Sequence, residues 1–388
     1  ILVLGHILVL SSPINHLILK IVKYANTTKR AVVIVSFSVM IVAFFNWGLG
    51  LIFGAILARK VGDYCYEKNI KINYPLIGAS GYVGLMVWHS GISGSAPIKV
   101  AEDNHLINLM LSTNDSSSFL DIPTSLNFDL TVLSSANLIT FISLLIVVPL
   151  TFFLIAKNTK SKDYQLQNIN FETSSNSISE NDKLENSRIF SLTFGLILIT
   201  AFFYQYWNNI LIFKITPNSL NFFMLALSIL LHNNIKSFLS ALNESIKGAS
   251  GILIQFPLYF GIMGIMKETG LIIYISDFFI SVSNEITLPI FTFFSAAIIN
   301  VFVPSGGGQW VIQGPVVISA ATELNVPIQK VVMALAYGDQ LTNMLQPFWA
   351  LPLLAITKLK AKEILPYTLI IMLVGLIIFI TSLLIFKF

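Results

Sequence analysis

Residues 300–315 read NVFVPSGGGQWVIQGP and interrupt an uncharged run that extends from Ile286 to Thr322. This run is far too long for one membrane span, because about 20 apolar residues cross the hydrocarbon core of a bilayer. Pro304 and the three glycines at 306–308 break the run near its middle, and neither end has a neighbouring Lys or Arg. The pattern predicts a re-entrant hairpin that enters and leaves the membrane on its outer side.

A second uncharged run, from Ala31 to Ala58, carries the residues NWGLG at 46–50 in its middle. Basic pairs stand at 29–30 before it and at 59–60 after it. Because Lys and Arg concentrate in cytoplasmic loops, both ends of the run are expected in the cytoplasm. The run therefore predicts a re-entrant hairpin that opens inward.

Two further apolar runs are broken by polar residues and glycines. The run from Ile72 to Ile98 is interrupted at 89–97, which read HSGISGSAP. The run from Val331 to Thr357 is interrupted at 338–343, which read GDQLTN, and again at Gln346 and Pro347. Backbone without helical hydrogen bonds is tolerated at membrane depth only where protein or a watery cavity satisfies it. Both runs therefore predict broken transmembrane helices.

The composition indicates a protein whose main solvent is lipid. Hydrophobic residues make up 55% of the 388 residues, charged residues make up only 11%, and the mean hydropathy is +0.78. Soluble domains are usually about a quarter charged. Ordinary transmembrane helices are expected at Leu130–Ala156, Ile189–Phe213, Ile215–Leu231, Gly248–Met266 and Ile364–Phe386. These runs predict an all-α polytopic membrane protein.

Two amphipathic stretches, Ile235–Lys247 and Leu271–Val282, are less decisive. A helix with one apolar and one polar face lies in the membrane interface or packs as a short helix against its neighbours. The pattern does not separate these two interpretations.

Lys and Arg are distributed unevenly between the predicted loops. The segments at 20–30, 59–71, 157–188, 236–247 and 358–363 hold 18 of the 23 Lys and Arg residues. The loop at 101–129 holds five acidic residues and no Lys or Arg. This asymmetry agrees with the positive-inside rule and supports the predicted multi-pass topology. The basic residues lie between apolar segments rather than in one patch, so no nucleic-acid partner is expected.

The hairpins and broken helices recur at a constant offset. Asn46 and Asn300 are 254 positions apart, and so are His89 and Asn343. The first hairpin is predicted to open inward and the second outward, so the pattern indicates an inverted-topology repeat. Residues 1–156 would form the first repeat, with an outer loop at 101–129. Residues 157–188 would form a cytoplasmic linker and 189–388 the second repeat.

Inverted repeats of this kind place the substrate near the membrane midplane. Such a site would lie between the hairpin tips and the broken helices, because half-helix N-termini there present free N–H groups and a positive dipole end to a carboxylate. The alternative is that the glycine-rich breaks only allow helices to pack closely.

A family resemblance is carried by four stretches of this sequence: 46–50 (NWGLG), 87–95 (VWHSGISGS), 303–315 (VPSGGGQWVIQGP) and 337–352 (YGDQLTNMLQPFWALP). With them the chain resembles the bacterial short-chain fatty acid transporter family, which lies within the ion transporter superfamily, over essentially its whole length. The resemblance implies a multi-pass protein of the plasma (inner) membrane that takes up acetoacetate, butyrate and similar short acids, driven by an ion gradient. It also implies a relation to elevator-type transporters, which are often homodimers.

The chain departs from the family pattern at two points. It begins at Ile1 inside an apolar run, so we expect its N-terminus to be truncated and the further N-terminal helix that the family usually has to be missing from the given sequence. Leu341 stands where an aromatic residue is expected, which would alter the shape of the pocket.

A small, anionic and partly apolar substrate needs N–H and hydroxyl donors and an apolar wall. The expected donors are Ser305, Gly306, Gly307, Gly308 and Gln309, opposed by Ser90, Gly91, Ser93, Gly94 and Ser95, with Asn343 completing the substrate-binding set. The tryptophans at 47, 88, 310 and 349 are either apolar walls or interfacial packing residues.

The coupling ion is expected to be H+ or Na+, and no other cofactor or metal is expected. Candidate ion-coupling residues are Asp339, His89, Asn46, Asn300 and Thr342. An ionisable residue inside the membrane is functional by default, so Asp339 would exchange a proton or hold Na+. The alternative roles are a helix-capping Asp339 and a hydrogen-bonded structural His89.

Three other functions compete with this interpretation. A C4-dicarboxylate transporter would favour Lys or Arg in the pocket, and none of the four breaks contains one. A channel would pass anions without a coupled gradient. A membrane-embedded enzyme could use His89, Asp339 and Ser305, but no nucleophile motif such as G-x-S-x-G occurs at these breaks. The single cysteine, Cys65, excludes an intrachain disulfide.

Overall fold

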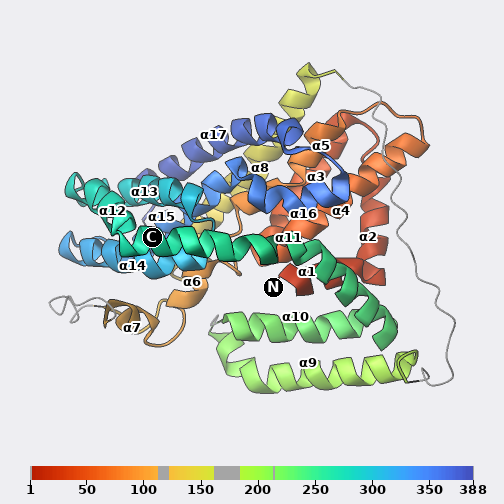
Figure 1. Ribbon diagram of the computed structural model, residues 1–388, viewed down its shortest axis with the longest axis horizontal. Helices are drawn as coiled ribbons and strands as arrows, with labels where there is room; N and C mark the ends of the chain where they lie inside the picture. The colour runs from red at the N-terminus through yellow and green to blue at the C-terminus, as the bar shows by residue number, and fades with distance from the viewer. Residues whose placement is uncertain (1, 112–121, 161–183, 213–214, 388) are drawn as a thin grey trace.

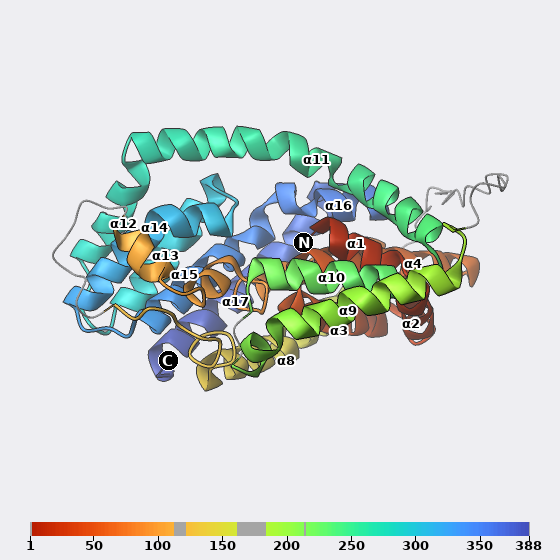
Figure 2. The ribbon, with the colours of Figure 1, turned by 90° about the horizontal axis from the view of Figure 1, so that it is seen from below.

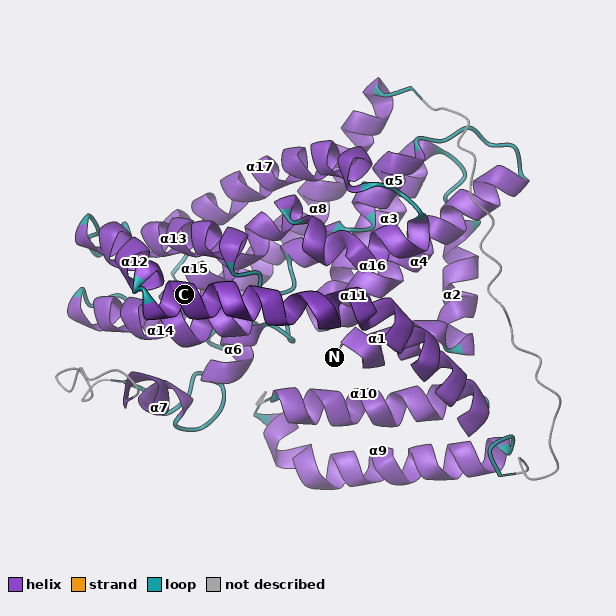
Figure 3. Ribbon diagram, viewed as in Figure 1, coloured by secondary structure: helices purple, strands orange, loops and turns teal. Residues whose placement is uncertain are grey.

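The computed structural model describes residues 2–111, 122–160, 184–212 and 215–387. Within these ranges 79% of the chain is helical and no β-strand occurs (Figure 3). The helices are α1 (Leu2–Leu10), α2 (Ser12–Val22), α3 (Thr28–Phe45), α4 (Trp47–Glu67), α5 (Tyr74–Ser80), α6 (Ser95–Val100), α7 (His105–Leu111), α8 (Ser135–Asn158), α9 (Arg188–Leu211), α10 (Pro217–Leu231), α11 (Ile235–Glu268), α12 (Leu271–Ser281), α13 (Leu288–Phe302), α14 (Gly306–Glu323), α15 (Ile328–Thr342), α16 (Pro347–Thr357) and α17 (Ala361–Ile385), with short 3₁₀ helices η1 (Val83–Met86) and η4 (Asn343–Leu345).

The outer helices expose apolar side chains that a water-soluble protein would bury. Ile146 of α8, Ile197 of α9 and Ile377 of α17 are each about 60% exposed or more. Soluble monomers rarely show contiguous apolar surface on this scale, whereas lipid solvates it. Five helical stretches in the described ranges are long and apolar enough to cross a membrane: Thr28–Phe45, Ser135–Asn158, Arg188–Leu211, Ala249–Glu268 and Ala361–Ile385. The chain is therefore a multi-pass membrane protein.

The predicted ordinary spans correspond to helices α8, α9, α10, α11 and α17, with one correction. The amphipathic stretch at 235–247 is not a separate element, because it continues without a break into the apolar stretch at 248–266 as the 34-residue helix α11. Figure 2 shows α11 as a long arch along one side of the molecule. The stretch at 271–282 forms α12, an 11-residue helix that buries Ile272 and Ser276.

Helices α3 and α4 form an antiparallel hairpin whose tip is Asn46. A Cβ on Gly50 would lie 2.5 Å from the Cα of Ala43, and a Cβ on Gly54 would lie 3.0 Å from Val39. Gly54 lies four residues after Gly50 on α4, whereas its partner Val39 lies four residues before Ala43 on α3. The two helices therefore run in opposite directions. Asn46 turns the chain with an extended backbone, and its side chain accepts a hydrogen bond from the N–H of Leu49.

Helices α13 and α14 form a second hairpin, with Pro304 in the turn. Gln309 donates a 2.9 Å hydrogen bond to the carbonyl of Ala296, just across the turn. At the far ends of the two helices, Leu288 packs in one apolar cluster with Ala320 and Ala321. The predicted break at 304–308 is present, but its glycines form the first turn of α14 rather than the turn itself.

Both predicted broken helices are broken, at boundaries that differ from the expected ones. The first break extends from Gly81 to Gly94, with only η1 inside it, and Pro97 lies within α6. In the second, residues 338–342 are the last turn of α15, and only η4 and the extended Gln346 interrupt the helix. The expected interruption at 338–342 is therefore wrong.

Each broken segment packs against its own hairpin through a glycine. A Cβ on Gly84 would lie 2.7 Å from the Cβ of Ala43 and 2.9 Å from Val39. A Cβ on Gly338 would lie 3.0 Å from the backbone nitrogen of Ala297 and would overlap the carbonyl oxygen of Phe293. The contacts of the second glycine are thus with residues 254 positions after those of the first.

The largest apolar core lies between α3, α4, α5, α8, α15, α16 and α17. Helices α9 and α10 pair with each other and lie at one side of this core (Figure 1). α1 connects the two parts, because Ile7 packs against Ile229 of α10 while Gly5 lies directly against the backbone of Gly48 and Leu49 in α4. The predicted linker at 157–188 and outer loop at 101–129 lie partly outside the described residues, at 161–183 and 112–121.

Candidate functional site

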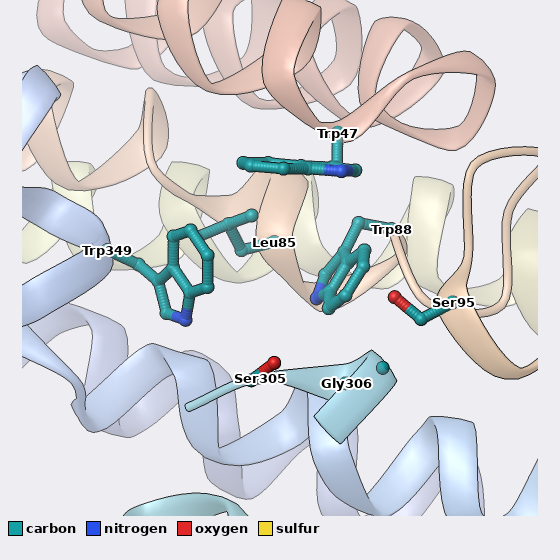
Figure 4. Close-up of a pocket in the computed structure, with 8 residues that line it drawn as sticks. Trp47, Leu85, Trp88, Ser95, Ser305, Gly306 and Trp349 are labelled. Atoms are coloured by element: carbon teal, nitrogen blue, oxygen red, sulfur yellow. The ribbon is translucent and has the colours of Figure 1, made fainter. Parts of the chain in front are cut away.

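Both hairpin tips and both broken segments meet around one small cavity of about 110 Å³. Its lining comes from the start of α4, the first break, the start of α6, the start of α14, and α16 (Figure 4). The lining residues are Trp47, Leu85, Trp88, Ser95, Ser305, Gly306, Gly307 and Trp349. None of these residues carries a charge.

The polar end of the cavity is the first turn of α14. Ser305 is the N-cap of this helix, and its hydroxyl accepts a 3.3 Å hydrogen bond from the N–H of Gly308. The other N–H groups of a first helical turn have no partner within the helix, and the helix dipole places positive potential there. This end of the cavity therefore suits an anion.

The glycines of this turn have different surroundings. A Cβ on Gly306 would lie 2.7 Å from Cε1 of His89 and 3.0 Å from Trp88, so only glycine fits beside these rings. A Cβ on Gly307 would meet nothing closer than Ser95, at 3.8 Å. A Cβ at 307 would therefore fit beside the cavity without displacing protein atoms.

Three indole rings and one aliphatic side chain form the apolar part of the cavity. Trp47 packs edge-on against Trp88, with ring centroids 5.9 Å apart, and against Trp349, with centroids 5.3 Å apart. Leu85 lies between these rings in Figure 4. The arrangement offers a short alkyl chain an apolar wall next to the anion-binding end.

A buried ionisable pair lies directly behind this site. Nδ1 of His89 is 2.5 Å from Oδ2 of Asp339, and both side chains are fully buried. The N–H of Ala96 donates a 3.0 Å hydrogen bond to Nε2 of the same imidazole. Because Nε2 is an acceptor, the ring proton is assigned to Nδ1 and the imidazole is neutral. Oδ1 of Asp339 has no hydrogen-bond partner within the described chain.

The two broken segments are joined to each other by further hydrogen bonds. Oε1 of Gln340 accepts 3.0 Å bonds from the N–H groups of His89 and Ser90. The hydroxyl of Tyr82 donates to the carbonyls of Asn343 and Gln346, at 2.9 Å each. The unwound backbone of one segment is thus satisfied by side chains of the other, as buried polar groups require.

A second polar cluster surrounds the tip of the α13–α14 hairpin. The amide nitrogen of Asn300 lies 2.7 Å from the carbonyl oxygen of Asp339, 2.9 Å from Oγ1 of Thr342 and 3.1 Å from Oδ1 of Asn343. Gln346 donates a 2.6 Å bond to the carbonyl of Asn300. The side-chain oxygens of Asn300 and Gln346 have no hydrogen-bond donor in the described chain. Unpaired buried oxygens are suitable ligands for a hard cation.

The structure brings only part of the predicted substrate-binding set to the cavity. Four of the eleven residues line it: Ser95, Ser305, Gly306 and Gly307. The other seven have structural partners or lie in the Asn300 cluster. Gly308 faces Met263, Gln309 bonds Gln313 and Ala296, Ser90 bonds Gln340, Gly91 packs on Phe44, Gly94 packs on the carbonyl of His89, Ser93 accepts from the N–H of Trp47, and Asn343 contacts Asn300.

The predicted ion-coupling set divides in a similar way. His89 and Asp339 form the buried pair, and Asn300 and Thr342 lie in the polar cluster beside it. Asn46 caps α4 and donates to Sδ of Met224, away from both. In the described ranges, no three His, Cys, Asp or Glu side chains are grouped as metal ligands.

Two features of the site were not predicted from the sequence. Leu85 is one apolar residue within an apolar run, so nothing marked it as part of the cavity. Asn137 is a buried polar residue of α8 that donates to the carbonyl of Ser90 and accepts from the hydroxyl of Tyr337. Its position in an otherwise apolar span was the signal that could have identified it.

Comparison with known proteins points to a single family. A family model described as "Short chain fatty acid transporter" matches residues 1–386. A protein of Escherichia coli (strain K12), provisionally named a short-chain fatty acid transporter, is 36% identical over 392 residues, which cover 100% of this chain and 85% of that protein. A protein of Haemophilus influenzae with the same provisional name is 35% identical over 375 residues, which cover 95% of this chain and 81% of that protein.

Proposed function

The chain belongs to the short-chain fatty acid transporter family, and we propose that it carries short monocarboxylates such as butyrate and acetoacetate across the plasma membrane through the cavity between its two hairpins. The observation that carries the proposal is the cavity itself. It joins an uncharged, donor-rich helix N-terminus to a wall of indole rings within about 110 Å³. Sites for drug-sized ligands are several times larger, so this cavity suits a molecule of few heavy atoms.

The charge of the lining favours a monocarboxylate over a dicarboxylate. No lining residue is Lys or Arg, so a second carboxylate would enter the cavity with no basic partner. Burying an unpaired charge is strongly unfavourable. One carboxylate can instead be held by the N–H and hydroxyl donors of α14 and α6, as anions are at helix N-termini.

An enzymatic function is disfavoured by the state of His89. Both of its ring nitrogens are engaged, one by Asp339 and the other by the N–H of Ala96. A general base needs a free nitrogen within reach of the nucleophile. The hydroxyl of Ser305 is itself an N-cap, so it is not positioned as a nucleophile by this imidazole.

The architecture that we propose is an inverted repeat of two re-entrant hairpins and two broken helices, working as an elevator. The matched contacts of Gly84 and Gly338 with their hairpins, 254 positions apart throughout, support the repeat. Lys and Arg stand directly at both ends of the first hairpin and at neither end of the second, which supports opposite orientations in the membrane. A homodimer, implied by the family resemblance, stays a prediction.

For the coupling ion we propose a proton carried by the His89–Asp339 pair. The imidazole is neutral, so an ionised Asp339 would be a buried negative charge with one unpaired oxygen. Such a charge is costly and is relieved when Oδ1 takes a proton. The imidazole lies against Gly306, so protonation of Asp339 would remove a negative charge from the neighbourhood of the substrate carboxylate.

Sodium is the second candidate for the coupling ion. It rests on the unpaired side-chain oxygens of Asn300 and Gln346, in the cluster where Asn300 also contacts the backbone carbonyl of Asp339. Neutral and ionised oxygens are the ligands that hard cations prefer.

Uptake into proteoliposomes tests the proposal. Initial rates for radiolabelled butyrate and acetoacetate would be measured under a pH gradient or a Na+ gradient, with protein-free vesicles as the control because protonated acids cross bilayers unaided. Saturable uptake above the control, stimulated by one gradient and not inhibited by succinate, would support the proposal. No uptake above the control under either gradient, from folded protein, would overturn it.

A further inference from the structure

The indole N–H of Trp88 is a buried donor without a hydrogen-bond partner in the described chain. Trp88 is only 5% exposed and lines the cavity. Figure 4 shows its nitrogen-bearing edge turned into the cavity, on the side that faces Ser305. Buried N–H groups in folded proteins are almost always paired, and one left unpaired needs an explanation such as a bound ligand.

A second buried tryptophan in this chain shows the ordinary arrangement. Trp310 is fully buried, and its indole N–H donates a 3.0 Å hydrogen bond to Nε2 of His105. An unpaired N–H is therefore not a general property of buried indoles in this fold.

Trp88 also lies at the polar end of the cavity. A Cβ on Gly306 would lie 3.0 Å from Cη2 of Trp88, so the indole stands beside the first turn of α14. The ring is held by Trp47 on one side and by stacking on His89 on the other, with centroids 4.6 Å apart. The donor is thus fixed in place before any ligand arrives, which lowers the entropic cost of binding.

We propose that Trp88 binds the substrate through its indole N–H, which donates a hydrogen bond to one oxygen of the carboxylate while the first turn of α14 donates to the other. The inference rests on the proposed transport of short monocarboxylates and assigns to Trp88 a polar role that its apolar ring does not suggest. A ligand without an acceptor at this point leaves the donor buried and unpaired. Sites built around such a donor discriminate strongly against ligands that cannot pair with it.

The test replaces the donor and keeps the ring. Trp88→Phe removes the N–H but retains an aromatic side chain against Trp47 and His89. The matched control is Trp310→Phe, which removes a buried indole N–H outside the cavity. In proteoliposomes, we expect Trp88→Phe to raise KM for butyrate and acetoacetate alike by about tenfold or more, the usual cost of leaving one partner of a buried hydrogen bond unpaired. The maximal rate should change by less than about threefold, and Trp310→Phe should leave KM within about threefold of wild type.

Equal KM values for Trp88→Phe and wild type, or equal rises in both variants, would overturn the inference while wild-type uptake leaves the proposed function intact. No uptake by wild type would instead refute the proposed function.

A measurement on the unaltered protein keeps the inference falsifiable if Trp88→Phe does not fold. With ¹⁵N-labelled indole groups, butyrate should shift one of the five tryptophan N–H resonances downfield, and butane should not. Single Trp→Phe replacements assign the resonance, by elimination if necessary. No shift at saturating butyrate, or a shift assigned to another tryptophan, would overturn the inference.

Discussion

Asp339→Asn separates proton coupling from substrate binding. The substitution keeps the shape of the side chain, and its oxygen can still accept the Nδ1–H of His89 at the 2.5 Å contact. It removes the charge and so mimics the protonated carboxyl. We therefore expect the variant to behave as a carrier that is permanently loaded with its proton.

The expected size of the effect follows from the single proton that the pair would carry. A gradient of one pH unit is worth about 1.4 kcal/mol per proton, which is a factor of ten in the accumulation ratio that the carrier can sustain. Wild-type initial uptake should therefore rise with an imposed gradient, and the carrier-dependent accumulation ratio should rise by up to about tenfold per pH unit. After subtraction of the protein-free rate, uptake by Asp339→Asn should not respond to the gradient.

Counterflow provides the second half of the assay. Exchange of external labelled butyrate for internal unlabelled butyrate needs binding and translocation but no net proton movement. We expect Asp339→Asn to retain this exchange within about threefold of wild type, by the usual separation of binding from coupling in mutant kinetics. A variant that still responds to the pH gradient would refute the role of Asp339. A variant that is folded but has lost counterflow would show that Asp339 serves binding rather than coupling.

Further predictions follow from the packing and the charge of other residues. Gly307→Val should reduce butyrate uptake by about two orders of magnitude without changing thermal stability, because the valine side chain would fill the cavity. Full activity of this variant would contradict substrate binding in the cavity. Gly338→Ala should destabilise the protein by about 1–3 kcal/mol, because its Cβ would overlap a carbonyl of α13. Gly261→Ala, whose Cβ would have nothing within 4 Å, should be neutral or slightly stabilising. Equal unfolding temperatures for the two variants would contradict the close packing at Gly338. Burial lowers the pKa of His105, whose neutral ring accepts the indole N–H of Trp310. The stabilising contribution of the neutral ring is therefore present above pH 6.5 and is lost as the pH falls through the lowered pKa. Tryptophan fluorescence and hydrogen exchange at α7 should change in that acid range, and no change there would contradict the prediction.

The elements that depend on local apolarity were predictable from the sequence. An uncharged run of known length specifies a helix in lipid, so α8, α9 and α17 begin and end within a few residues of the expected positions. The tips of the hairpins were also predictable, because Asn46 and Pro304 interrupt runs that are too long for one span.

The boundaries of the breaks were not predictable, because tertiary contacts decide them. Gly338 resembles a helix breaker in sequence, yet it is helical, and its missing side chain allows α15 to lie against α13. Tyr82 belongs to an apolar run that looks helical, yet the backbone around it is irregular. Its hydroxyl instead bonds two carbonyls of the second break, more than 250 residues away.

The candidate site was predictable at the level of segments but not of side chains. The sequence indicated that four segments would converge, and they do at the cavity. It could not show that Gly306 faces His89 while Gly307 faces open space, because both are glycines in one run. The unpaired indole of Trp88 likewise became visible only when the surrounding acceptors were placed.

Substrate protection of an introduced thiol tests most directly whether the substrate occupies the cavity. The chain has one cysteine, Cys65, which is fully buried, so a thiol at Ser95→Cys can be modified against a low background. The account predicts that saturating butyrate slows modification at Ser95→Cys by about tenfold and leaves the exposed control Ser250→Cys on α11 unchanged. Equal modification rates at Ser95→Cys with and without butyrate, in a variant that still transports it saturably, would show that the substrate binds elsewhere.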